Sequence, residues 1–195
     1  KQDFVRPERA APPPIIVPEP RERVNRKESG RVSRVGVSYE WILPPARNGA
    51  TRQLVSDALQ HALSDRIREK LRATYEVDVD FEPYMDHCSF ALETTVTPKR
   101  AAQVREIVDT ALRESDAVAA DVERLRDEAL FTFAFLELSV DEALERAETE
   151  TNAYGAPRTI ADAIASYNAV TADDVRELMA SLLSPERAYV ELTEE

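Results

Sequence analysis

Two hydrophobic periods alternate along this chain, and their order limits the folds that it can adopt. Residues 35–43 alternate apolar and polar positions and stop at Pro44, which predicts a β-strand. Residues 49–72 carry apolar side chains at every third or fourth position, which predicts an amphipathic helix. The period of two returns in residues 77–81 and in the β-rich residues 88–97. The chain therefore begins with a strand, a helix and two further strands.

Helical patterns dominate from Pro98 onwards. Two helices are indicated by stripes of apolar residues: Val104, Ile107, Val108 and Ala111 in the first, and Val122, Leu125, Ala129 and Phe133 in the second. Residues 131–139 alternate aromatic side chains as a strand would, but their flanks are helical. We interpret them as the buried end of the second helix, with Phe131, Phe133 and Phe135 forming a core cluster.

The remaining elements are marked by their ends. Ser139 with Glu142 and Thr171 with Asp174 have the spacing of capping boxes, which predicts the first turns of two more helices. The helix that starts near Ser139 is expected to end at Gly155, in a left-handed conformation. Residues 188–193 alternate again and predict a final strand.

Strands and helices are thus segregated along the chain, which favours an α+β fold. We expect an antiparallel-dominated mixed sheet with helices packed on one face, in a single domain at residues 32–195. Residues 1–31 differ, because positions 1–20 hold six of the twelve prolines and a charge-rich segment follows. Such a segment favours extended conformations over helix. It is expected to be a linker or strap, in which residues 15–17 dock as a short edge strand.

Charge and composition exclude several classes of protein. The net charge of −12 argues against nucleic acid or an anionic membrane as the main partner. The single cysteine, Cys88, excludes an internal disulfide framework, so no oxidising compartment is required. No apolar run approaches the roughly 18 residues that a membrane helix needs, so no membrane insertion is expected. The chain does not begin with Met and is expected to be part of a longer or processed protein; a cytoplasmic location is slightly favoured over a periplasmic or secreted one.

Arg68 and Tyr75 lie at the boundary between the long helix and the strand that follows it. Seven residues are close to two helical turns, so the two side chains would share a face, roughly 10 Å apart along the axis. A guanidinium and a phenol hydroxyl could together hold a peptide carbonyl. The alternative is structural: Arg68 belongs to a group of cations favoured at a helix C-terminus, and Tyr75 is an ordinary strand aromatic.

Three further candidates favour structural interpretations. The acidic residues of the second strand, Glu76, Asp78, Asp80 and Glu82, share one face, but carboxylates two residues apart diverge on a strand. A solvated face is therefore favoured over a catalytic pair or a hard-cation site. His87 and Cys88 are neighbours whose side chains point to opposite faces of a strand, so they are poorly placed to bind one metal. Trp41 is expected in the core.

Several stretches, in this order, resemble one family. They are "IREKLRATYEV" (67–77), "NAYGAP" (152–157) and "VTADDVRELMASLLSPERAYVEL" (170–192). From about Arg31 to its end, the chain resembles a half-domain of the insulinase/pitrilysin-type (inverzincin) metallopeptidases, which include mitochondrial processing peptidase. The resemblance implies two such domains paired across a closed chamber. In the family, one half carries zinc on H-x-x-E-H and another contributes an Arg–Tyr pair that binds the substrate.

The zinc motif of this family is absent. Its two histidines must lie four residues apart, together with the Glu that activates the zinc-bound water. This chain has only His61 and His87, 26 residues apart. The resemblance therefore implies a zinc-free half that is non-catalytic on its own and binds no metal. Arg68 and Tyr75 would bind the peptide substrate, with zinc on a partner domain or subunit that bears H-x-x-E-H.

Two alternatives from other classes remain open. The first is a scaffold or interaction domain of the same fold with no proteolytic role. The second is an independent hydrolase that uses the carboxylates of residues 76–82 and resists chelators.

Overall fold

A computed structural model describes residues 22–25, 34–43, 49–71, 77–84, 87–136, 139–183 and 188–194. The strands are β1 (Glu22–Asn25), β2 (Arg34–Leu43), β3 (Val77–Pro83), β4 (Cys88–Val96) and β5 (Ala188–Glu194). The helices are α1 (Gly49–Leu71), the short 3₁₀ turn η1 (Pro98–Arg100), α2 (Ala101–Arg113), α3 (Ser115–Ala120), α4 (Val122–Leu136), α5 (Val140–Tyr154), α6 (Ile160–Asn168) and α7 (Ala172–Leu182).

The five strands form one sheet in the order β1-β5-β2-β4-β3. The pair of β1 and β5 is parallel and all other pairs are antiparallel, so the predicted antiparallel-dominated α+β fold is confirmed. Strand β1 falls within residues 1–31, where sequence patterns gave no strand at this position. The strand predicted at residues 15–17 lies outside the described residues.

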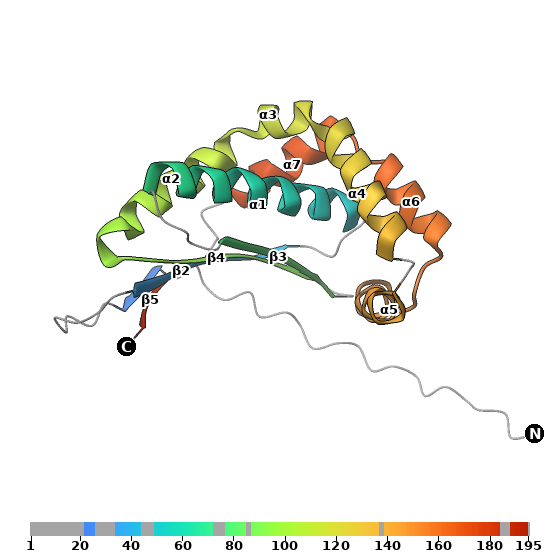
Figure 1. Ribbon diagram of the computed structural model, residues 1–195, viewed down its shortest axis with the longest axis horizontal. Coiled ribbons are helices and arrows are strands. Elements are labelled where there is room, and N and C mark those ends of the chain that lie inside the picture. Colours follow the sequence, from blue (N-terminus) through green and yellow to red (C-terminus); the bar gives the residue numbers. More distant parts are fainter. Residues whose placement is uncertain are drawn as a thin grey trace, which may run out of the picture.

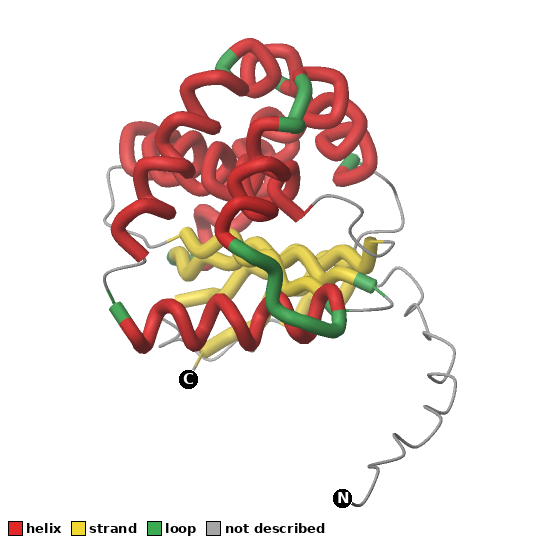
Figure 2. The backbone as a smooth tube through the Cα atoms, turned by 90° about the vertical axis from the view of Figure 1, so that its right-hand side faces the viewer, coloured by secondary structure: helices red, strands yellow, loops and turns green. Residues whose placement is uncertain are grey.

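The helices form a second layer above one face of the sheet (Figure 1). Helix α1 runs along the sheet, with α2 and α7 on one side of it and α4 and α6 near its N-terminal end. Helix α5 is placed differently: it lies across the end of the sheet at which β3 and β4 are joined (Figures 1 and 2).

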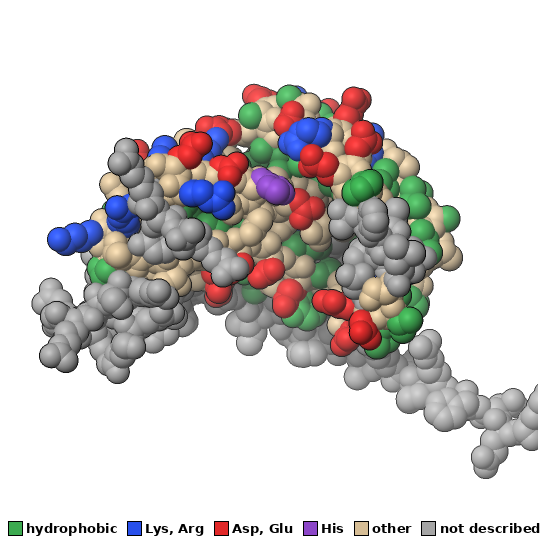
Figure 3. Space-filling view, viewed as in Figure 1, with side chains coloured by type: hydrophobic (Ala, Val, Ile, Leu, Met, Phe, Trp, Pro, Cys, Tyr) green, Lys and Arg blue, Asp and Glu red, His purple; other side chains and the backbone are tan. Residues whose placement is uncertain are grey.

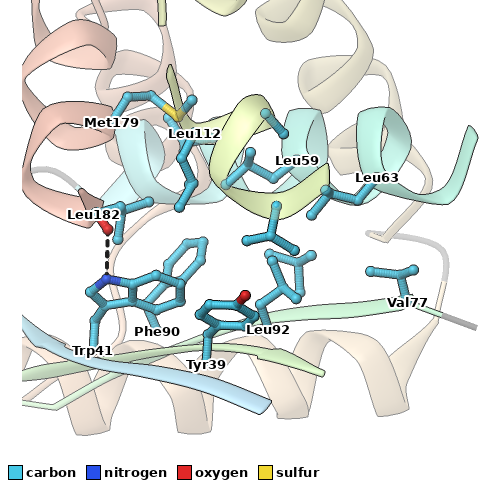
Figure 4. Packing of buried hydrophobic residues seen from close by; sticks show 14 of the residues in the cluster. Tyr39, Trp41, Leu59, Leu63, Val77, Phe90, Leu92, Leu112, Met179 and Leu182 are labelled. Atoms are coloured by element: carbon cyan, nitrogen blue, oxygen red, sulfur yellow. Dashed lines mark hydrogen bonds between the residues drawn. The ribbon is translucent and has the colours of Figure 1, made fainter. Parts of the chain in front are cut away.

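The core lies between the sheet and α1, α2 and α7. Five alternating residues of β2 are buried: Val35, Val37, Tyr39, Trp41 and Leu43. They meet the buried side of α1, which includes Leu59 and Leu63, and residues of α2 and α7 such as Leu112 and Met179 (Figure 4). Burying one large apolar side chain stabilises a fold by about 1.5–3 kcal/mol. Trp41, 4% exposed, is in the core as predicted.

Two polar side chains on the otherwise apolar side of α1 hold β3 in place. The Ser56 hydroxyl donates a 2.6 Å hydrogen bond to the carbonyl oxygen of Val79. One turn later, the Gln60 amide donates to the carbonyl oxygen of Val77. Because β3 has no other strand beyond it in the described sheet, these bonds satisfy backbone groups that β4 does not reach.

The predicted helix ends agree with the structure at two positions. Thr171 and Asp174 form a complete capping box at the start of α7. Gly155 follows the end of α5 with φ of 80°, in the left-handed region that glycine adopts without steric cost. Ser139 immediately precedes α5 as predicted, while the side chain of Glu142 lies outside the described residues.

The prediction of a buried aromatic cluster at the end of α4 is wrong for Phe131, whose surface is 67% exposed. Residues 131–136 continue the helix. The buried stripe of α4 includes Val122 and Leu125, and about 100° of rotation per residue places position 131 on the opposite side. The side chains of Phe133 and Phe135 lie outside the described residues.

Candidate functional site

Arg68 lies in the last turns of α1 with its guanidinium in solvent. The side chain is 67% exposed, and its Nη1 is 3.8 Å from Oδ1 of Asp65, which is itself 72% exposed. An exposed pair of this kind contributes about 0–1 kcal/mol and leaves the guanidinium available to other ligands. Tyr75 lies outside the described residues, so the predicted pairing of Arg68 with Tyr75 stays a prediction.

The neighbouring cations of α1 divide into two kinds. Arg66 forms an ion pair with Glu114, the residue that follows α2, and so joins two helices of the fold. Arg68 and Lys70 are exposed in the last turn, where the helix dipole favours a positive charge. Arg66 therefore has a clear structural partner, whereas Arg68 has only a weak one.

The acidic side chains of β3 face solvent. Asp78, Asp80 and Glu82 are all exposed, in agreement with the predicted solvated face, and Glu76 lies outside the described residues. Figure 3 shows acidic side chains gathered along the edge of the molecule formed by β3 and α5. The Tyr84 hydroxyl donates a 2.7 Å hydrogen bond to Oε2 of Glu82, and this bond raises the pKa of Tyr84.

The pair His87 and Cys88 has structural contacts. The His87 ring stacks on Tyr84 with 4.6 Å between ring centroids. Cys88 is buried, and burial raises the pKa of its thiol to about 11. A thiol that keeps its proton is a poor nucleophile and a poor metal ligand. Within the described ranges, no group of three or more His, Cys, Asp or Glu side chains could hold a metal ion.

The structure adds a cavity that sequence patterns did not predict. It has a volume of about 690 Å³ and lies between the first half of α1, the end of β3, and helices α4, α5 and α6. Helix α1 contributes Gln53, Asp57 and His61, which are four residues apart and therefore line one side of the helix. This polar row lies next to the apolar row that packs on the sheet.

One wall of the cavity is an ion-pair network around Glu150. This side chain is only 7% exposed and lies 3.3 Å from Nη1 of Arg146 and 3.4 Å from Nη2 of Arg158. The backbone N–H of Arg158 also donates to Glu150 at 2.6 Å. The guanidinium of Arg158 lies 4.2 Å from the centroid of the Tyr154 ring. Together these contacts fix the end of α5 against the loop that leads to α6.

Asp57 lies at the α1 wall of the cavity. Its Oδ1 accepts a 3.0 Å hydrogen bond from the Gln53 amide. Burial raises the pKa of the Asp57 carboxyl, and the negative charge of Glu128 on α4 adds to this shift; the Gln53 hydrogen bond and His61 oppose it. Burial, followed by the charge of Asp57, raises the pKa of Tyr167 on α6 to about 12.

Comparisons with known proteins identify the fold. No protein-family model matches the sequence, and no curated protein matches it. Among solved structures, a protease from Helicobacter pylori matches 96% of this chain with a TM-score of 0.71 and 16% identity. A peptidase M16 inactive domain from Pseudomonas fluorescens matches 82% with a TM-score of 0.64 and 16% identity. Complex III₂ from Candida albicans matches 87% with a TM-score of 0.62 and 12% identity.

This chain has the fold of an M16 peptidase domain. It spans 48%, 40% and 44% of the lengths of those three chains, respectively. Inactive peptidase domains are among the structures that share its fold. The zinc ion that this fold family implies does not fit the donors present, since H-x-x-E-H is absent from the sequence. No helix in the described part of the chain is long and apolar enough to cross a membrane.

Proposed function

We propose that this chain is the zinc-free, substrate-binding half of an insulinase-type metalloendopeptidase. It would act with an H-x-x-E-H domain, located either on the same polypeptide or on a partner subunit. The observation that carries the proposal is the similarity to an M16 inactive domain in a chain whose two histidines are 26 residues apart. The partner would supply the zinc, and with it the polarisation of the scissile carbonyl and the activated water.

The contribution of this chain would be to hold the peptide. Arg68 has an exposed guanidinium at the end of α1, and we propose that it donates hydrogen bonds to a substrate carbonyl together with the hydroxyl of Tyr75. Donors that face a developing oxyanion stabilise the transition state more than the ground state. The exposed carboxylates of β3, such as Asp78 and Asp80, would favour basic peptide segments near this surface.

The test uses the chain assembled with its zinc-bearing partner. Arg68→Ala and Tyr75→Phe should each lower kcat/KM for an unstructured peptide by about 100-fold or more, as expected when one oxyanion donor is lost. Lys70→Ala is the matched control, because it removes an exposed cation from the same helix end. A chelator should abolish cleavage. Equal turnover in the Arg68→Ala and Lys70→Ala assemblies would contradict the role of Arg68.

A second candidate is a scaffold domain with no proteolytic role. The observation that favours it is the similarity of the fold to a chain of complex III₂ from Candida albicans. An H-x-x-E-H segment on the same polypeptide, or in an adjacent reading frame, would favour the peptidase. A stable complex of the chain with a partner that lacks this motif would favour the scaffold.

A further inference from the structure

The cavity between α1, β3, α4, α5 and α6 has the dimensions of a ligand site. Its volume of about 690 Å³ falls within the roughly 300–1,000 Å³ of typical small-molecule pockets. It lies at the N-terminal half of α1, whereas Arg68 lies near the other end of this 23-residue helix. Along α1 the lining ends at His61, and Arg68 follows seven residues later, about 10 Å further along the helix axis. Arg68 is not part of the cavity lining.

The carboxylates that line the cavity differ in whether an arginine of the described residues pairs with them. Glu150 is the shared partner of Arg146 and Arg158. Both carboxylate oxygens of Glu128 accept hydrogen bonds from Nη1 of Arg124, at 2.8 Å and 2.9 Å. Two lining carboxylates remain, Asp57 on α1 and Glu145 on α5.

No Lys or Arg in the described part of the chain forms an ion pair with Asp57 or Glu145. The only hydrogen-bond partner of Asp57 there is the neutral amide of Gln53. Burial, and to a smaller extent the charge of Glu128, disfavours the ionised carboxylate, while the Gln53 hydrogen bond and His61 on the same helix oppose part of this shift. A cation placed beside Asp57 would offset both effects.

The remaining lining suits an alkyl chain. Aromatic side chains come from three elements: Phe81 on β3, Tyr154 on α5 and Tyr167 on α6. The lining also includes the small or apolar residues Ala50, Leu125 and Ala129. Such a surface favours methylene groups, and an aromatic ring also attracts an ammonium group.

We propose that this cavity binds an alkylammonium group, with the ammonium head on the Asp57 carboxylate and the alkyl chain against the aromatic lining. Glu145 adds a second negative charge at the same cavity. A metal ion is a poorer fit, because no three His, Cys, Asp or Glu side chains of the described residues are placed to hold one. The ligand is either a free polyamine or a lysine side chain of a peptide, since both present the same group. This proposal does not depend on a zinc-bearing partner.

The experiment titrates the chain with three probes and follows its backbone amide signals by NMR. The probes are cadaverine, a lysine residue blocked at both backbone ends, and pentanol as an uncharged control. We expect saturable shifts at the amides of Gln53, Asp57 and Tyr167 with at least one amine, and none with pentanol. Shifts with cadaverine alone identify a polyamine as the source, and shifts with blocked lysine alone identify a peptide side chain.

Two charge-removing variants locate the site. Asp57→Asn should weaken amine binding by about tenfold, the value of one charge-assisted hydrogen bond, and Glu145→Gln should weaken it less. Asp78→Asn, which removes an exposed carboxylate of β3, should leave the affinity unchanged. The proposal is overturned if neither amine saturates by about 10 mM, if the shifts map outside the cavity, or if Asp57→Asn and Asp78→Asn bind equally. Because the shift map is obtained on the unaltered chain, it decides the question even where a variant fails to fold.

Discussion

The indole Nε1–H of Trp41 donates a hydrogen bond of 2.8 Å to the backbone carbonyl oxygen of Leu182, which joins β2 to the last turn of α7 (Figure 4). The two residues are 141 positions apart, and both are buried. The carbonyl of Leu182 belongs to the group at a helix C-terminus that has no partner within the helix. The single tryptophan of the chain therefore has a polar role in the core as well as an apolar one.

Replacing Trp41 by Phe should destabilise the chain by at least about 2 kcal/mol. The substitution removes the donor, leaves a buried carbonyl unsatisfied and opens space in the core. Urea unfolding followed by far-ultraviolet circular dichroism measures the effect. Tyr84→Phe is the control, since it removes a hydrogen bond to Glu82 from an exposed aromatic, and its free energy of unfolding should change by less than about 0.5 kcal/mol. Equal stability of the two variants would contradict the role of the Trp41 bond.

Replacing Glu150 by Ala should cost about 3 kcal/mol of stability, because it leaves the guanidinium groups of Arg146 and Arg158 partly buried without their carboxylate. Glu150→Gln should cost less, since an amide oxygen still accepts from the Arg158 backbone N–H. Glu148→Gln changes an exposed position of the same helix and should be nearly neutral. Urea denaturation of the three variants measures their free energies of unfolding. Unfolding of Glu150→Ala at the same urea concentration as Glu148→Gln would contradict the role of Glu150.

Cys88 should resist thiol reagents while the chain is folded. Burial holds its pKa at about 11, so at pH 8 only about one thiol in a thousand is ionised, and the side chain is also inaccessible. Labelling at pH 8 should therefore be slow in buffer and fast in denaturant, with Cys88→Ser as the unlabelled control. Rapid stoichiometric labelling of the folded chain would show that the thiol is reactive. Because the unfolded thiol ionises at lower pH, this group also makes stability fall as the pH rises from about 9 to 11.

Sequence patterns predicted the elements whose side chains have a clear period. The alternation in β2, the apolar rows of α1 and α2, and the capping box at Thr171 all reappear in the structure. These patterns arise because one side of each element is buried or because local hydrogen bonds determine where it starts. Strand β1 has no such pattern: its sequence "ERVN" contains one apolar residue, and its parallel pairing with β5 uses backbone groups that every residue has.

The candidate cavity could not be predicted in the same way. Gln53, Asp57 and His61 are visibly four residues apart in the sequence, but polar rows on helices usually face solvent. The row becomes one wall of a cavity because α4, α5 and α6 lie opposite it, although Gln53 and His61 remain exposed. The positions of those helices depend on tertiary packing. Phe131 shows the opposite error. This aromatic residue was expected in the core, but the rotation of helix α4 places it at the surface.

Asp57 should make the chain less stable at neutral pH than in acid. Its pKa is raised in the folded state, chiefly by burial and also by Glu128 on α4, while Gln53 and His61 on its own helix partly offset the shift. The folded state therefore binds more protons than the unfolded state at pH values just above 3.8, the ordinary pKa of this carboxyl. The contribution of Asp57 to the free energy of unfolding falls as the pH rises through that window.

Asp57→Asn removes the ionised form, so it should raise stability relative to the unaltered chain at pH 7, and the difference should shrink towards pH 3. Unfolding curves of both proteins across this pH range measure the difference in stability. Asp78→Asn is the control for the change in net charge. A difference that grows in acid would show that the Asp57 carboxylate is stabilised by a partner in the fold.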